Sequence, residues 1–161
     1  MTTNQKNVFF TIIYAFSFIS LLMTAGSCFI NYQDGVLLLE NTSIGNNLLF
    51  KTYSIGSYNL FAIGIFIVAL LLGVIIKLFK DDKIINIITL GMGVVIIIYS
   101  LIMLFVVKRE IFISNVKIDS TVLTLASTMQ ELYLQIFIYS CTLVGSGFCL
   151  FLNNRKENYE K

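Results

Sequence analysis

The 161-residue sequence contains no histidine, no proline and no tryptophan, and only 12% of its residues are charged. Without histidine, the chain lacks the commonest metal ligand and the usual general base near neutral pH. A net charge of +2 is too small to mark a nucleic-acid-binding surface. These absences argue against an enzyme, a metal site, a bound cofactor and a nucleic-acid partner.

The sequence is instead rich in hydrophobic residues. Hydrophobic residues make up 57% of the chain, above the roughly 45–50% of an average soluble domain. The few charged residues would cover a water-soluble domain of this length poorly, so the sequence predicts a protein surrounded largely by lipid. The abundance of Ile, Phe, Asn and Lys is typical of an AT-rich genome, and we expect a bacterial source.

Four windows carry no charge: residues 7–33, 52–76, 84–107 and 132–154. A helix of roughly 20 apolar residues crosses a hydrocarbon core of about 30 Å, and none of the windows alternates as barrel strands do. The sequence therefore predicts an all-α integral membrane protein, a single domain over residues 1–161 that forms a four-transmembrane-helix bundle. The expected spans are about 8–30, 59–79, 84–107 and 132–152.

The distribution of basic residues predicts the orientation in the cell membrane, because Lys and Arg are enriched in cytoplasmic segments. With both termini inside, seven of the 11 basic residues are cytoplasmic and four are external. The cytoplasmic set is Lys6, Lys77, Lys80, Lys83, Arg155, Lys156 and Lys161. We therefore expect cytoplasmic N- and C-termini, a cytoplasmic tail over residues 153–161, and external loops over about 31–58 and 108–131.

The apolar clusters of the two external loops suggest β-structure. Val36–Leu39 and Leu48–Phe50 flank turn-forming residues, and apolar residues nearly alternate from Ile111 to Ile118. We expect a small β-hairpin or sheet there. Ser127 and Gln130 match a capping box, so the fourth helix is expected to begin there, or earlier near Ser120.

The link Lys80–Lys83 is so short that the second and third spans must form an antiparallel hairpin. Asp82 is a candidate N-cap for the third helix. In the first span, the small residues Thr24–Cys28 could mark a signal-peptide cleavage site. Because the apolar stretch continues through Ile30, a first transmembrane helix is the favoured interpretation.

Small residues recur on single helical faces, and such faces let membrane helices approach closely. The second and third spans also contain small residues in the form of glycines, including Gly91 and Gly93 in the third. These faces are interpreted as contacts within one monomer, with an oligomer seam as the alternative. The candidate set is Ser20, Thr24, Cys28, Gly91, Gly93, Cys141, Gly145 and Cys149.

The polar residues of the spans are uncharged, and Ser and Thr can form hydrogen bonds with their own helix backbone. No ionisable group lies within the four charge-free windows, which argues against a proton- or sodium-coupled transporter acting alone. The three cysteines lack paired ligand spacing and are expected to be packing residues. A polar lining for a solute path is the alternative for the polar set, which comprises Asn86, Thr89, Tyr99, Ser100, Gln135, Tyr139, Ser140 and Thr142.

Four spans with two external loops resemble the claudin-like tetraspans in layout. The chain lacks the tryptophan-centred motif and the first-loop cysteine pair of that family, so the resemblance is one of architecture. We expect a non-enzymatic accessory, assembly or protective (immunity-like) subunit that acts through helix packing and its external loops. Its partners would be the lipid bilayer and another membrane protein or a second copy. The alternative is an oligomeric pore or a small-solute transport component.

Overall fold

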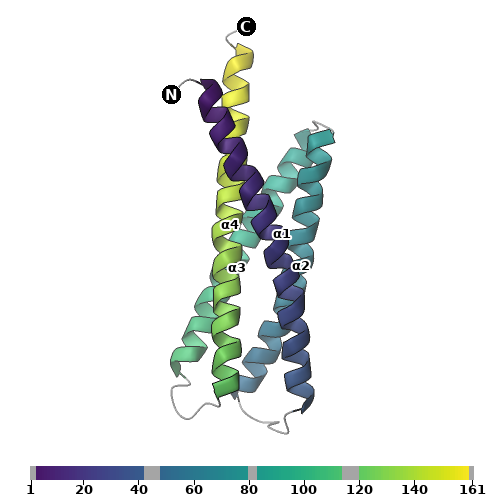
Figure 1. The fold of residues 1–161 in the computed structure, drawn as a ribbon, viewed down its shortest axis with the longest axis vertical. Helices are drawn as coiled ribbons and strands as arrows, with labels where there is room; N and C mark the ends of the chain where they lie inside the picture. The colour runs from purple at the N-terminus through teal and green to yellow at the C-terminus, as the bar shows by residue number, and fades with distance from the viewer. Residues whose placement is uncertain (1–2, 42–47, 80–82, 114–119, 160–161) are drawn as a thin grey trace.

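The computed structural model describes four α-helices and no other regular structure, over residues 3–41, 48–79, 83–113 and 120–159 (Figure 1). Helix α1 is Thr3–Asn41, α2 is Leu48–Phe79, α3 is Lys83–Ile113 and α4 is Ser120–Tyr159. The chain has no proline to interrupt a helix, and its long Leu, Ile and Val runs keep each helix continuous. The predicted all-helical class is confirmed over the described residues.

The helices run up and down in sequence order and close into a ring. Both termini lie at the end of the molecule where α2 leads into α3, which we call the terminus end (Figure 1). Helix α1 packs against α2 and α4, and α3 packs against the same two helices. The predicted antiparallel hairpin of the second and third helices is confirmed, while Asp82, its candidate N-cap, lies outside the described residues.

Helix α1 changes its main partner along its length. Near the terminus end it bonds to α4, where Asn153 Nδ2 donates to Asn7 Oδ1 at 2.9 Å. Toward the opposite end it packs on α2, where the rings of Phe29 and Phe61 meet at a centroid distance of 5.6 Å. In Figure 1, α1 accordingly crosses from beside α4 to beside α2. The terminus end therefore consists of two helix pairs, α1 with α4 and α2 with α3.

The interior of the bundle is apolar, and so is its exterior. Core residues such as Leu21, Ile67 and Tyr133 are fully buried, whereas Phe16 and Met23 are 66% and 71% exposed. Each helix holds a segment long and apolar enough to cross a membrane: 5–33, 58–77, 84–107 and 127–153. An apolar outer surface of this extent is unfavourable in water and neutral in lipid.

The expected β-structure of the external loops is wrong for the residues that the structure describes. Residues 34–41 continue α1, residues 48–57 begin α2, and Ile111 and Ile113 belong to α3. Val116 and Ile118 lie outside the described residues. The physical reason is that the loss of hydropathy marks where a helix leaves the apolar layer, not where its backbone hydrogen bonding stops.

The start of α4 follows the earlier of the two expectations. The helix begins at Ser120, so Ser127 lies inside it and is not an N-cap. In α1 the helix passes without interruption through Thr24–Cys28 and on to Asn41, and Ala25 is buried in the core.

Candidate functional site

Each of the four helix interfaces contains one glycine at which the neighbouring helix approaches closely. A Cβ atom added at any of these positions would meet a side chain of the next helix at 2.5–3.1 Å. The four pairs are Gly64 with Phe29 (α2 and α1), Gly73 with Thr89 (α2 and α3), Gly93 with Val144 (α3 and α4), and Gly147 with Tyr14 (α4 and α1). The glycines allow the close helix approach that stabilises bundles in lipid.

The small-residue face of α1 lies inside the bundle. Thr24 is 3% exposed, Cys28 is fully buried and Ser20 is half-buried. The Cβ of Cys28 lies 3.5 Å from the position that a Cβ on Gly64 would take, so this face contacts α2. The arrangement agrees with the interpretation of this face as a contact within one monomer.

The small-residue face of α4 lies on the outside. Gly145 is exposed with no atom within 4 Å of the position of an added Cβ, and Cys141 and Cys149 are half-buried. The third helix divides in the same way: Gly93 is buried against α4, whereas Gly91 is open. The spacing therefore identified residues that share a face, but not the direction in which that face points.

The outward side of α4 is also less apolar than that of the other helices. Gln135, Thr142 and Gly145 are exposed along α4, and the mean hydropathy of the α4 segment is 1.7, against 2.1 for the α1 segment and 2.8 for the α2 and α3 segments. We call Gln135, Ile138, Thr142, Gly145 and Cys149 the outer α4 face. Small and amide-bearing residues on one helical face are those that pair helices in lipid.

Most hydroxyl groups within the apolar segments bond to their own helix, as expected. Thr89 Oγ1 donates to the Ile85 carbonyl at 2.7 Å, and Ser100 Oγ donates to the Ile97 carbonyl at 3.0 Å. One hydroxyl pair also joins two helices: Ser17 Oγ of α1 lies 2.7 Å from Thr142 Oγ1 of α4.

Ser140 departs from this pattern. Its hydroxyl oxygen is buried and has no hydrogen-bond partner among the described residues.

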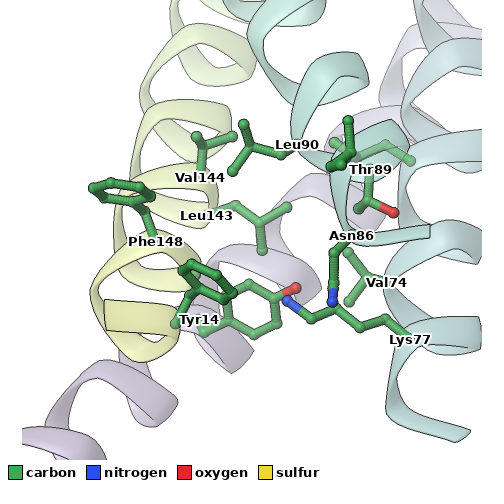
Figure 2. Close-up of a pocket in the computed structure, with 13 residues that line it drawn as sticks. Tyr14, Val74, Lys77, Asn86, Thr89, Leu90, Leu143, Val144 and Phe148 are labelled. Carbon is green, nitrogen blue, oxygen red and sulfur yellow. The ribbon is translucent and has the colours of Figure 1, made fainter. Parts of the chain in front are cut away.

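A cleft of about 250 Å³ lies between the two helix pairs of the terminus end (Figure 2). It is half-open to the surroundings, and all four helices contribute to its walls. The lining residues are Tyr14 from α1; Leu70, Val74 and Lys77 from α2; Asn86, Ile87, Thr89 and Leu90 from α3; and Leu143, Val144, Gly147, Phe148 and Phe151 from α4.

The chemistry of the cleft is amphipathic. Its walls are mainly aliphatic and aromatic, and Lys77 extends into it from α2 toward Tyr14 (Figure 2). Among the described residues that line it, Lys77 is the one basic side chain and none is acidic. The cleft is therefore suited to a molecule with an apolar body and a negative group.

No group of three or more potential metal ligands occurs within the described helices. Cys28, Cys141 and Cys149 are free thiols, and they come from an interior face and an exterior face that do not meet. The three thiols therefore do not gather in one cluster.

Comparisons of the chain with models of protein families, with curated proteins and with solved structures give no match. Functional inference therefore depends on the geometry of the bundle itself.

Two features of the site could not be found from the sequence. Gly147 lies two residues after Gly145 but points to the opposite side of α4, against Tyr14. Lys77 entered the sequence argument only as one of the basic residues that set orientation. The signal for both was weak, because the meaning of each residue depends on which helix lies opposite.

Proposed function

We propose that this chain is a multi-pass protein of the bacterial cell membrane, with both termini cytoplasmic, that acts without catalysis as an accessory, assembly or protective subunit. The observation that supports this function is the outer α4 face, which is open and carries Gln135 and Gly145. The partner is a transmembrane helix of another protein or of a second copy, bound along this face.

The described packing supports a role in binding over a role in chemistry. The inward faces are occupied by helix–helix contacts such as Gly93 with Val144, and the described residues hold no group of three or more potential metal ligands. The outward faces of α1, α2 and α3 present many large side chains, such as Phe16, Phe66 and Phe105, beside the open glycines Gly26 and Gly91. Lipid tails solvate such surfaces well, so they give little reason for a helix to associate.

The alternative of an oligomeric pore has less support. Copies that surround a water-filled path must line it with their outer faces, and the polar side chains of this bundle are mostly inside it. Ser17, Thr24, Ser100 and Ser146 are buried, and each donates to a backbone carbonyl three or four residues earlier.

Site-specific photo-crosslinking in native membranes tests the proposed function. A photoreactive residue in place of Ile138, on the outer α4 face, should give one adduct of discrete mass. Ile98 of α3 is a matched control, because it is another outward isoleucine, 54% exposed, and it does not line the cleft. Adducts at both positions or at neither would contradict the proposal, as would ion conduction by the purified protein in liposomes. The adduct mass also distinguishes a second copy from a different protein.

The orientation has its own test. In a variant whose three cysteines are replaced by serine, a cysteine introduced at Thr42 should react with a membrane-impermeant thiol reagent added to intact cells. Protection of that cysteine until the cells are lysed would reverse the orientation.

A further inference from the structure

The cleft at the terminus end extends along the helices from one edge of the apolar segments toward their middle. Lys77 is the last residue of the apolar segment 58–77, and Leu70 lies seven residues deeper on the same helix. Seven residues of helix correspond to about 10 Å. The cleft therefore has a charged mouth at the predicted membrane surface and an apolar interior about 10 Å deep.

We propose that this cleft binds an anionic phospholipid of the surrounding membrane, with the phosphate at Lys77 and part of one acyl chain between the two helix pairs. The proposal relies on the membrane location proposed above, and it is independent of the partner at the outer α4 face. The apolar walls of the cleft and the position of the Lys77 charge at its mouth both favour a phospholipid.

The charge of the mouth selects an anionic head group. Lys77 points into the cleft toward Tyr14, and no acidic side chain is present among the described lining residues to neutralise it (Figure 2). Basic pockets between membrane helices near the bilayer surface are typical sites for anionic lipid head groups. An ammonium group and a phenol hydroxyl are both donors suited to phosphate oxygens.

The size and shape of the cleft select part of a long molecule. Its volume of about 250 Å³ is slightly below the roughly 300–1,000 Å³ of pockets that enclose a drug-sized ligand. Leu70, Leu90 and Leu143 form apolar walls, and the half-open side allows the rest of a lipid to remain in the bilayer. A small hydrophilic anion would leave these walls without a contact.

Fluorescence quenching by brominated lipids tests the proposal directly. The chain has no tryptophan, so Phe148→Trp places a single reporter on the wall of the cleft. Phe16→Trp gives a matched control reporter on the outward surface of α1, where Phe16 is exposed. Each variant is reconstituted in phosphatidylcholine bilayers that contain increasing fractions of either phosphatidylglycerol or phosphatidylcholine brominated on its acyl chains.

At position 148 we expect phosphatidylglycerol to bind about fivefold more tightly than phosphatidylcholine, the effect of one basic side chain near a charged lipid surface. At position 16 the two lipids should bind equally. In the position-148 background, Lys77→Gln should abolish the preference and Lys77→Arg should retain it. Lys6→Gln is the charge-matched control, because Lys6 is exposed at the same end of the bundle.

Equal quenching by both lipids at position 148 would overturn the proposal, and it is the result expected if another helix covers the cleft. A preference that survives Lys77→Gln, or that Lys6→Gln removes, would do the same. If Lys77→Gln does not fold, as judged by circular dichroism, the salt dependence of the lipid preference with Lys77 present decides. A charge-based preference must fall as salt is raised, and one that does not fall overturns the proposal.

Discussion

The small-residue faces of α1 and α4 have the same spacing in the sequence and opposite places in the bundle. Thr24 and Cys28 of α1 are buried, whereas Gly145 of α4 is open to the surroundings. A spacing of four residues places side chains on one side of a helix, but it says nothing about what lies opposite. The inner face stabilises the monomer, and the outer face is available for a second helix.

The largest expected effect sharpens this contrast within one helix. Gly93→Leu inserts a side chain where a Cβ alone would already lie 2.5 Å from Val144 Cγ2, while Gly91 is open. We expect a loss of about 3 kcal/mol or more in the free energy of unfolding for Gly93→Leu, at the upper end of the range for overpacking. Gly91→Leu should change it by less than about 0.5 kcal/mol. Unfolding in mixed detergent micelles measures both, and equal losses would contradict the arrangement of α3.

The next effect compares the two faces themselves. Thr24→Leu adds bulk to a buried position and removes the bond from Thr24 Oγ1 to the Ser20 carbonyl. We expect it to cost about 2 kcal/mol of unfolding free energy. Gly145→Leu should leave the unfolding free energy unchanged and instead abolish the photo-adduct formed from Ile138. If Gly145→Leu destabilises the monomer as much as Thr24→Leu does, the two faces are equivalent and the comparison fails.

A smaller effect distinguishes two glycines of α4, Gly145 and Gly147. An added Cβ on Gly147 would lie 3.1 Å from the ring of Tyr14, which must shift by a few tenths of an ångström. We expect Gly147→Ala to cost about 1 kcal/mol. Gly145→Ala should be neutral or slightly stabilising, because alanine is the better helix former. The difference in melting temperature between the two variants in one detergent is the measurement, and a reversed order would refute this placement.

The smallest effect concerns the hydrogen bond that joins α1 to α4. Removal of the Ser17 hydroxyl by Ser17→Ala should cost about 0.6 kcal/mol, the average for hydrogen bonds between membrane helices. Thr142→Val should cost a similar amount, and the double variant little more than either alone, because both remove the same 2.7 Å contact. Fully additive losses would show that the two hydroxyls do not interact.

The sequence predicted the four helices and the tight hairpin because these follow from the length of apolar runs and the length of one link. It did not predict how far the helices extend, since residues 34–41 and 48–57 mix short apolar clusters with charged and polar residues and are still helical. The cleft could not be predicted from the sequence either. Lys77 and Tyr14 are distant in sequence and lie at one site only because α2 and α1 belong to the opposing helix pairs of the terminus end.

The bond between Ser17 and Thr142 joins positions 125 residues apart. Chains are synthesised from the N-terminus, so α1 enters the membrane long before its partner exists. Until the last helix emerges from the ribosome, the half of α1 that belongs beside α4 lacks its native partner. Completion of the ring is thus a late event in biogenesis, and a chain that stops before α4 leaves the first helix exposed to lipid or to other assembly factors.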